Sequence, residues 1–472
     1  MTLTLVNIWK IENHTPHFGL TALAAFLQKR IPNLDIKIIE GLDPLKDIIK
    51  TKPDIVSFTS DTLAFQKTKN IAIKIKKKLK IPILIGGVHI TAMPESFSFP
   101  FDVGSIGEGE ITLSQLIESF LKNKKFIPSE LKKIDGLIFK ENKKIIKTSP
   151  RKLIKNIDEL PFPAREITPM EDTYLKNQFN LFGVKRQISI MTSRGCPYHC
   201  VFCGSPVQWG TVRFHSPEYV IKEIKFLVKN YNIDSIMFWD DLFIAPIERL
   251  EKLKDLIIKN KLNKKLVFFG YARANLITED VCKVLAKMNT KRLIFGLESG
   301  SPRILNYLKQ NSVTVKDNKR AVDLCRKYGI TSSSGYIVGT PGETIEDLQC
   351  TYDLMKHHPL DNTQIYILTP YPGTKIWIEA KKKKLVSGNM DFDKLFVQLP
   401  PISFFDFFKT QKNLINKRIF LNTKYRNNKD YMKLVLKIQK LAYIQNIIFY
   451  IKIIPQNLDL IKRLIFNKIK CL

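Results

Sequence analysis

Apolar and polar positions in the first part of the chain follow two alternating periods. Three segments repeat apolar residues at helical spacing, namely Leu20–Lys29, Ala64–Leu79 and Ile111–Leu121. Short runs rich in β-branched residues lie between them and are expected to be strands: Leu3–Ile8, Asp35–Ile39, Asp54–Phe58, Ile83–Ile85 and Asp102–Ile106. Strands that alternate with amphipathic helices imply parallel βαβ units. We therefore expect an α/β fold, in which residues 1–125 form a five-stranded, doubly wound, Rossmann-like domain that binds its ligand at the carboxyl ends of the strands.

The next segment, residues 126–180, has a different pattern. It contains a predicted hairpin, Gly136–Phe139 with Ile145–Lys147, followed by a stretch with two prolines, Pro161 and Pro163. Proline favours extended chain over helix at itself and at the residue before it. We interpret this segment as a connector and place the domain boundary in it.

A second alternating series occupies residues 181–380. Its expected strands are Ile188–Thr192, Ser235–Trp239, Leu266–Tyr271, Arg292–Leu297, Thr331–Val338 and Thr363–Leu368. The helical patterns between them include Pro217–Asn230, Arg249–Lys259, Glu279–Met288 and Lys316–Tyr328. Six such repeats predict a partial (β/α)6 TIM-like barrel, with the active site at the carboxyl ends of its strands.

The remainder, residues 381–472, is predicted to be a basic helical extension. It holds 20 Lys and Arg against 5 Asp and no Glu. Within it, Tyr431–Ile454 is apolar with Lys at intervals, as in an amphipathic helix. Such a helix either packs on the body of the protein or lies on a partner domain or an anionic membrane surface.

The charge and the spacing of the cysteines argue against nucleic-acid-binding and disulfide-bonded secreted proteins. The net charge of +32 comes mostly from Lys spread over all 472 residues, and no recognisable nucleic-acid-binding module accompanies it, so we do not expect a nucleic-acid role. No apolar run is long enough to span a membrane, and the first residues resemble a strand more than a signal peptide. The seven cysteines do not suggest a disulfide framework, since four of them lie far apart. These features favour a cytoplasmic protein.

The other three cysteines form the sharpest chemical signal in the chain. Cys196, Cys200 and Cys203 follow directly after a predicted barrel strand, with spacings of three and two residues. Thiolates select zinc, copper(I) or iron–sulfur clusters. A structural zinc site closes four ligands, usually as two separated pairs, and this sequence has no second pair. Three ligands on a four-iron cluster leave one iron open, which is what catalysis at a metal requires.

The pattern Cys-x3-Cys-x-Phe-Cys resembles that of the radical S-adenosylmethionine (SAM) superfamily. The resemblance implies that Cys196, Cys200 and Cys203 hold a [4Fe–4S] cluster, whose open iron chelates SAM and cleaves it reductively to a 5′-deoxyadenosyl radical. It places Phe202 beside the adenine. It also implies SAM contacts at the ends of later strands, from Asp240, Arg273, Glu298 and Gly339. Asp240 with Asp241 also fits a helix N-cap, and Arg273 with Glu298 also fits an internal ion pair.

The amino-terminal domain has glycines and polar residues at its predicted strand ends, where a large flat ligand can approach the backbone. The motifs His17-Phe18-Gly19, Gly86-Gly87-Val88-His89 and Gly107-Glu108 resemble those of the cobalamin-binding domain that is fused to radical enzymes of the Mg-protoporphyrin cyclase and methylase types. The resemblance implies cobalamin contacts from His17, Phe18, Gly19, Ser60, Gly86, Gly87, His89, Gly107 and Glu108. One departure is that the Asp-x-His-x-x-Gly motif, which supplies a cobalt-ligating histidine elsewhere, is absent. The alternatives are cobalamin bound without a protein ligand and a domain that has lost the cofactor.

These resemblances predict an anaerobic enzyme that methylates or otherwise modifies an unreactive carbon of a small molecule, using a reducing electron donor such as flavodoxin or ferredoxin. The alternatives are a radical cyclase or oxidoreductase without methyl transfer, a non-catalytic cobalamin-binding protein, and a tRNA-modifying enzyme. The last typically has a second cluster in its amino-terminal domain, whereas residues 1–195 contain no cysteine. The sequence does not identify a general base. Tyr198, Tyr271, Tyr336 and Tyr366 are candidates by position alone.

Overall fold

A computed structural model describes residues 1–8, 16–175, 182–395, 421–425 and 428–453. The chain forms two compact units. The amino-terminal unit comprises Met1–Lys176, Gly204–His215 and Tyr371–Asp393. The barrel unit comprises Asn177–Cys203, Ser216–Pro370 and Lys394–Leu472. Each unit is therefore built from segments that are distant in sequence.

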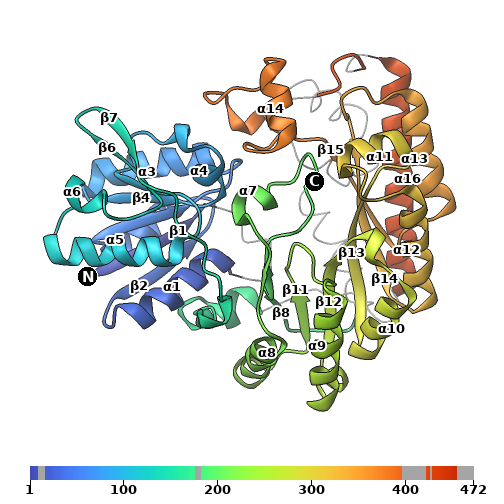
Figure 1. Ribbon diagram of the computed structural model, residues 1–472, viewed down its shortest axis with the longest axis horizontal. Helices are drawn as coiled ribbons and strands as arrows, with labels where there is room; N and C mark the ends of the chain where they lie inside the picture. Colours follow the sequence, from blue (N-terminus) through green and yellow to red (C-terminus); the bar gives the residue numbers. More distant parts are fainter. Residues whose placement is uncertain (9–15, 176–181, 396–420, 426–427, 454–472) are drawn as a thin grey trace. The chain divides into compact units, whose positions relative to one another are not determined.

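The amino-terminal unit contains a sheet in the order β2-β1-β3-β4-β5-β6-β7 (Figure 1). Pairing from β2 to β5 is parallel, and the β6–β7 hairpin continues the sheet in antiparallel fashion. The strands are β1 (Thr2–Asn7), β2 (Asp35–Glu40), β3 (Ile55–Thr59), β4 (Ile83–Gly86), β5 (Val103–Ser105), β6 (Leu137–Glu141) and β7 (Lys144–Lys147). The order 2-1-3-4-5 is that of a doubly wound fold, whose ligand crevice lies outside the carboxyl ends where the strand order reverses, between β1 and β3.

Helices cover both faces of this sheet. Two of them, α1 and α5, pack against each other, and their apolar residues join those of the strands in one buried core. The helices of the first segment are α1 (Phe18–Arg30), α2 (Leu45–Lys50), α3 (Phe65–Leu79), α4 (Val88–Ala92), α5 (Gly109–Asn123) and α6 (Pro128–Leu131). Short helical turns follow at η1 (Pro94–Ser96), η2 (Ile157–Glu159), η3 (Arg165–Ile167) and η4 (Met170–Tyr174).

Three findings about this unit differ from the organisation inferred from sequence. The hairpin interpreted as part of a connector is the edge of the sheet, because β6 pairs with β5. The segment that follows Cys203, with α7 (Ser205–Trp209) and β10 (Arg213–Phe214), belongs to this unit. So does Tyr371–Asp393, with α14 (Lys375–Lys382). Local periodicity cannot reveal these associations because they depend on contacts between distant residues.

The barrel unit contains a six-stranded sheet in the order β15-β14-β13-β12-β11-β8, with every pairing parallel. Its strands are β8 (Gln187–Ile190), β11 (Ser235–Phe238), β12 (Val267–Ala272), β13 (Thr290–Glu298), β14 (Thr331–Val338) and β15 (Asn362–Ile367), and the short β9 (Ser193–Arg194) follows β8. This is the architecture expected for a partial (β/α)6 barrel, whose sites lie at the carboxyl ends of the strands.

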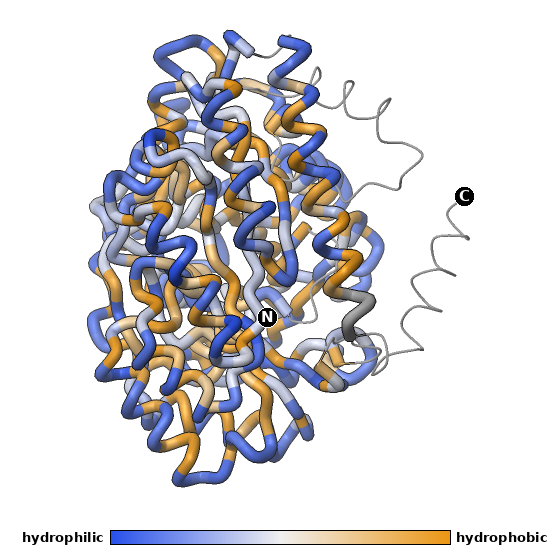
Figure 2. The backbone as a smooth tube through the Cα atoms, turned by 90° about the vertical axis from the view of Figure 1, so that its right-hand side faces the viewer, coloured by the Kyte–Doolittle hydropathy of each residue, from blue (hydrophilic) through white to orange (hydrophobic). Residues whose placement is uncertain are grey.

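The barrel helices begin at well-defined caps. Thr314 and Thr344 form capping boxes with Asp317 and Asp347, so two backbone N–H groups at each helix start are satisfied. Figure 2 shows apolar and polar stretches alternating along the outer helices of this unit, as expected for helices with one buried face. The helices are α8 (Pro217–Tyr231), α9 (Ile247–Lys259), α10 (Glu279–Met288), α11 (Pro302–Lys309), α12 (Val315–Lys327) and α13 (Ile345–His357), with the turns η5 (Leu262–Lys264) and η6 (Ala274–Leu276).

The carboxy-terminal helix α16 (Lys429–Ile453) packs against α13 and the edge strand β15 (Figure 1). Asn446 Oδ1 accepts a hydrogen bond from the Thr363 backbone N–H at 2.7 Å, and Asn446 Nδ2 donates to the Thr363 carbonyl at 2.8 Å. This amide thus occupies backbone groups that an edge strand leaves unpaired. The packing on the body of the protein, one of the two arrangements expected from sequence, is the one observed, although Ile454 lies outside the described residues. Within those residues, no helix is long and apolar enough to cross a bilayer.

Candidate functional site

The loop that carries the three cysteines is anchored at its start by a buried carboxylate. Asp240, which follows β11, is 1% exposed. Its Oδ1 accepts hydrogen bonds from the backbone N–H of Thr192 at 2.6 Å and of Ser193 at 2.7 Å, and its Oδ2 accepts one from Thr192 Oγ1 at 2.7 Å. Arg249 Nη2 donates to the Thr192 carbonyl at 3.0 Å. Asp240 therefore fixes the exit of β8. It does not cap a helix, since α9 begins only at Ile247.

The far half of the loop is held by the carboxy-terminal end of α11 and its cap residue, Gln310. The Val201 N–H donates to the Leu308 carbonyl at 3.0 Å, and Gln310 Nε2 donates to the His199 carbonyl. A further turn within the loop joins the Cys203 N–H to the Cys200 carbonyl at 3.0 Å. Cys196, Cys200 and Cys203 all remain partly exposed. The three cysteines are therefore partly exposed residues on a fixed backbone.

Arg273, which follows β12, brings a positive charge to these sulfurs. Its Nη1 donates to Cys200 Sγ at 3.2 Å, and its guanidinium lies over the Tyr198 ring at 3.8 Å from the centroid. Another nitrogen of the guanidinium, Nη2, donates to Ser312 Oγ. Burial raises the pKa of the Cys196 thiol, whereas the charge of Arg273 acts to lower it. Arg273 thus favours the thiolate form, which is the form that binds metal.

The donor set fits an iron–sulfur cube better than a single metal ion. A zinc ion requires its ligands to converge on one point. Among the described residues, no three His, Cys, Asp or Glu side chains converge in this way. In a cube each cysteine binds a different iron, so the three sulfurs need not converge. The sulfur-only set and the hydrogen bond from Arg273 to Cys200 are consistent with a cluster.

Glu298, at the end of β13, forms a buried ion pair with Lys309. The two side chains are 9% and 6% exposed, and Lys309 Nζ lies 2.7 Å from Glu298 Oε1. The same ammonium group is 5.5 Å from the centre of the Phe202 ring. The structure therefore contradicts the internal pair of Arg273 with Glu298, because Lys309 is the partner of Glu298 and Arg273 binds Cys200 and Ser312. No motif in the sequence identified Lys309, which lies on α11, as a residue of this site.

Gly339 begins a tight turn after β14 and has a φ of 82°, in the region that favours glycine. Its N–H donates to Glu343 Oε2 at 2.8 Å and to the Tyr431 hydroxyl oxygen at 3.1 Å. Glu343 is fully buried, and burial raises its pKa to about 7. The sequence did not identify Glu343 or Tyr431 as partners of Gly339, and Tyr431 lies 92 residues after Gly339.

The candidate cobalamin residues lie at the carboxyl edge of the other sheet, and several have internal partners. Ser60 is buried, and its Oγ donates to the Asp61 carbonyl at 2.8 Å. Gly87 has a φ of 95°, and a Cβ there would lie 2.7 Å from Thr59 Oγ1 and 2.8 Å from the Ser60 backbone. Gly87 is therefore required by the close approach of the β3 and β4 ends, whether or not a ligand binds. Gly86 is only partly buried and lies directly before it.

Glu108, which follows β5, accepts one hydrogen bond from a side chain and one from a backbone N–H, and both fix neighbouring segments of the chain. Its Oε1 is 2.8 Å from Arg213 Nη1, in an ion pair whose side chains are 2% and 8% exposed. Its Oε2 accepts from the Ile154 N–H at 3.0 Å. Arg213 also donates to the Ile154 carbonyl at 2.9 Å. Glu108 thus ties the segment after Cys203 to the amino-terminal unit, a structural role that sequence reasoning missed.

His89, at the start of α4, is fully buried. Its ring stacks on Phe65 at 4.0 Å and meets the edge of Phe392 at 5.0 Å, and Nδ1 lies 3.2 Å from Thr62 Oγ1. Burial lowers its pKa to about 4, so the ring is neutral near pH 7. Its Nε2 has no hydrogen-bond partner within the described atoms.

The remaining candidates of this edge are more accessible. His17 caps α1, because its Nδ1 accepts from the Leu20 N–H at 3.3 Å, and Phe18 and Gly19 follow it at the helix start. Burial lowers the pKa of His17, against the opposing charges of Glu40 and Asp61. Gly107 has a φ of 83°, with nothing within 4 Å of the position of a Cβ. The space next to the Gly107 backbone is therefore open.

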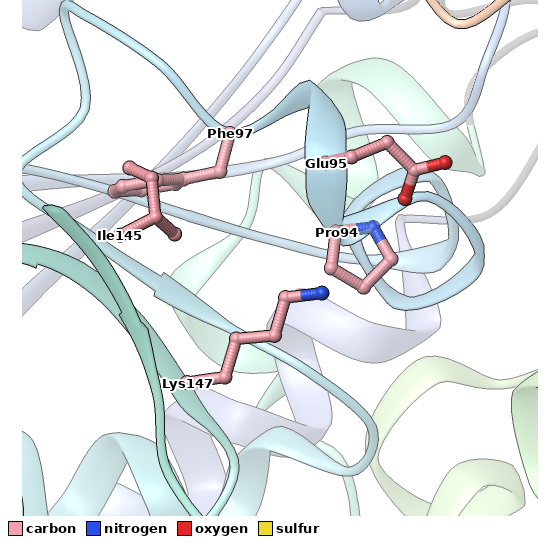
Figure 3. Close-up of a pocket in the computed structure, with 5 residues that line it drawn as sticks. All are labelled: Pro94, Glu95, Phe97, Ile145 and Lys147. Atoms are coloured by element: carbon pink, nitrogen blue, oxygen red, sulfur yellow. The ribbon is translucent and has the colours of Figure 1, made fainter.

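A pocket of about 500 Å³ lies elsewhere on the amino-terminal unit. Figure 3 shows the residues that line it, Pro94, Glu95, Phe97, Ile145 and Lys147. They come from η1 and its neighbour Phe97 and from the edge strand β7. None of them is at the carboxyl end of a parallel strand, so this pocket is distinct from the predicted cofactor edge.

The four tyrosines named as base candidates have separate surroundings. Tyr198 accepts a hydrogen bond from Asn275 Nδ2 at 3.1 Å and lies under Arg273. Tyr271 contacts Trp239 edge-on at 5.6 Å, and burial raises its pKa to about 12. Burial also raises the pKa of Tyr336 and of Tyr366. The surroundings of these four tyrosines do not identify any one of them as the general base.

Comparison with known proteins supports both halves of this description. Residues 190–355 match the radical SAM superfamily model, and residues 4–117 match the B12 binding domain model. An uncharacterized methyltransferase of Pyrococcus horikoshii is 36% identical over 384 residues, which cover 79% of this chain and 80% of that protein. The anaerobic magnesium-protoporphyrin IX monomethyl ester cyclase of Rubrivivax gelatinosus is 26% identical over 75% of this chain and 62% of its own length.

A solved structure shows the same fold. It is the radical SAM methyltransferase TsrM from Kitasatospora setae, with cobalamin and a [4Fe–4S] cluster bound. It superposes with a TM-score of 0.65 at 20% identity and covers 81% of this chain and 75% of that one.

Proposed function

The chain belongs to the radical SAM enzymes that contain a B12 binding domain, and from that premise we propose that it methylates an unreactive carbon of a small molecule. The observation that carries the proposal is the cysteine loop. Its three partly exposed cysteines lie on a backbone that is held by hydrogen bonds with Asp240, Leu308 and Gln310. Arg273 donates a hydrogen bond to Cys200 Sγ. The similarity to the Pyrococcus methyltransferase over four fifths of that protein supports methyl transfer as the reaction.

The cofactors supply the chemistry that amino-acid side chains lack: the cluster provides the electron that cleaves SAM, and cobalamin provides a methyl carrier. The residues of this chain hold and orient these groups. Cys196, Cys200 and Cys203 would bind the cluster. Phe202, Glu298 and the Gly339 turn would contact SAM, while Arg273 and Lys309 place positive charge around the loop. Asp240, proposed from the family resemblance as a SAM ligand, would act here by positioning the loop.

Cobalamin would bind at the carboxyl edge of the amino-terminal sheet. The accessible residues His17, Phe18, Gly19, Gly86 and Gly107 would contact it directly. Gly87, Ser60, His89 and Glu108 would instead shape the edge through their internal contacts. The electron donor would be a flavodoxin or ferredoxin in the cytoplasm, in keeping with the free state of the six cysteines that the structure describes.

Product stoichiometry tests methyl transfer. The reconstituted enzyme is incubated anaerobically with reductant, hydroxocobalamin and SAM, so that SAM is the only source of methyl groups, and with each compound of a panel of candidate small-molecule substrates. Methylation of a carbon by this route yields S-adenosylhomocysteine and 5′-deoxyadenosine together. Turnover that produces 5′-deoxyadenosine alone would contradict methyl transfer.

A second candidate function is radical cyclisation or oxidation without methyl transfer. The similarity to the Rubrivivax cyclase over three quarters of this chain favours it. It predicts 5′-deoxyadenosine and a product of unchanged carbon count, so mass spectrometry of the product separates it from methylation. A protein that only binds cobalamin would release neither nucleoside product from SAM.

A further inference from the structure

The carboxy-terminal helix contacts the turn at the end of β14 through one hydroxyl group. The Tyr431 hydroxyl donates to Glu343 Oε2 and accepts from the Gly339 N–H at 3.1 Å. Glu343 Oε2 in turn accepts from the same N–H at 2.8 Å. Tyr431 and Glu343 are both fully buried. These three groups form a closed triangle of hydrogen bonds inside the barrel unit.

The position of Tyr431 is itself fixed. Asn428 Oδ1 accepts from the Tyr431 N–H at 2.9 Å at the start of α16, and the Tyr431 ring stacks on Tyr425 at 5.1 Å. The preceding segment contacts the same turn, because Asn422 Nδ2 donates to the Glu343 carbonyl at 2.8 Å. The extension therefore holds both ends of the turn that runs from Gly339 to Glu343.

This turn needs such support. Gly339 and Gly342 both have positive φ values, 82° and 76°, and glycine has the greatest backbone freedom to lose on ordering. Within the turn, Thr340 Oγ1 and Glu343 Oε1 are buried and have no hydrogen-bond partner among the described atoms. Tyr431 and Asn422 tie its two ends to the carboxy-terminal extension, and Arg303 Nη2 on α11 donates to the Gly342 carbonyl at 2.8 Å.

We propose that Tyr431 is a positioning residue for SAM: through Glu343 and the Gly339 N–H it fixes the turn against which the cosubstrate binds. The inference rests on the proposed assignment of Gly339 to the SAM site. It gives the carboxy-terminal extension a role in cosubstrate affinity, in addition to covering the edge strand β15.

The test compares Y431F with N446A in the full-length, cluster-reconstituted protein. Y431F keeps the ring and removes the hydroxyl. N446A removes the contact of the same helix with Thr363 and leaves the Gly339 turn untouched. Anaerobic calorimetry with SAM should show a Kd about three- to tenfold higher for Y431F, the size expected for one lost hydrogen bond. In turnover the KM for SAM should rise while kcat at saturating SAM changes little, and iron and cobalamin contents should match wild type.

N446A should lower the Tm and leave the Kd for SAM within twofold of wild type. An unchanged Kd in Y431F, or an equal loss in N446A, would overturn the proposal. E343Q, which keeps an acceptor for Tyr431 and Gly339, should retain affinity, and Y431F added to E343A should cost no more than E343A alone. If the losses of SAM affinity from Y431F and E343A added up in the double variant, that result would also overturn the proposal. This comparison applies even if Y431F alone proves unstable. Absence of SAM binding by wild type would instead contradict the proposed function.

Discussion

Arg273 combines two effects on the proposed cluster, a positive charge and a hydrogen bond to a sulfur. Both favour electron density on the cluster and therefore raise its reduction potential. We predict that R273A lowers the midpoint potential by on the order of tens of millivolts. R273K, which keeps the charge but not the planar fork, should show a smaller change. Potentiometric titration followed by electron paramagnetic resonance measures both. An unchanged or higher potential in R273A would show that the contact with Cys200 Sγ does not act on the cluster.

Glu343 predicts a pH dependence of stability with a defined sign. Burial raises its pKa from 4.5 to about 7, Asp347 adds to the increase, and the hydrogen bonds from Tyr431 and Gly339 oppose it. Between these two values the folded protein binds a proton that the unfolded chain has released. The contribution of Glu343 to stability is therefore complete below the unfolded pKa and is lost as the pH rises through the folded one.

E343Q cannot titrate, so its free energy of unfolding relative to wild type should rise across this window, by on the order of 3 kcal/mol. Urea denaturation at about pH 5 and about pH 8 measures the difference. A difference that is constant with pH, or that shrinks as pH rises, would contradict the raised pKa.

Sequence alone identifies only those site residues that lie close together along the chain. The three cysteines and Phe202 occupy adjacent positions on one loop, so their spacing identifies them. The partners that hold this loop and the β14 turn are remote: Leu308 and Gln310 lie more than 100 residues after Cys200, and Tyr431 lies 88 residues after Glu343. Single-sequence reasoning cannot pair such residues. The two structural alternatives considered for these residues, Asp240 as a helix cap and Arg273 as the partner of Glu298, are contradicted by the structure for the same reason.

The strands and helices named from sequence lie close to those observed, but several helices were not named. β14 and α10 have the predicted bounds, and most other strands differ by one or two residues. Among the helices not named from sequence, α2, α4, α6 and α7 have six residues or fewer, which is too short for a helical period to show, whereas α11, α13 and α14 are longer. The antiparallel continuation of the first sheet by β6 and β7 was also missed, because strand pairing is a long-range property.

The segment between α7 and α8 depends on the buried pair of Glu108 and Arg213. We predict that R213A destabilises the protein by about 3–5 kcal/mol, because it leaves the Glu108 carboxylate buried without its cation. The double variant E108Q with R213M should recover most of that loss, since the Gln side chain can still accept from the Ile154 N–H. Urea unfolding of the three proteins tests this. A loss in the double variant equal to that in R213A would mean that packing, and not the unpaired charge, dominates.

The molecule as a whole combines two α/β units whose chain segments interleave. The chain passes from the barrel unit to the amino-terminal unit directly after Cys203, the last of the three cysteines, and returns at Ser216. Residues 381–472, with 20 Lys and Arg against 5 Asp, contribute +15 of the net charge of +32, and the rest is spread over the other 380 residues. Function in such a molecule depends on the sites it contains and cannot be inferred from its fold alone.

The central claim is that three thiolates of one loop bind a [4Fe–4S] cluster with one iron left open for SAM. Its most direct test is anaerobic reconstitution of wild type and of the triple variant C196A/C200A/C203A with iron and sulfide. The reduced wild type should give the electron paramagnetic resonance signal of a [4Fe–4S]+ cluster, and SAM should change that signal by binding to the open iron. The triple variant should give no such signal. A wild type that assembles no cluster, or a variant that assembles it equally well, would contradict the account.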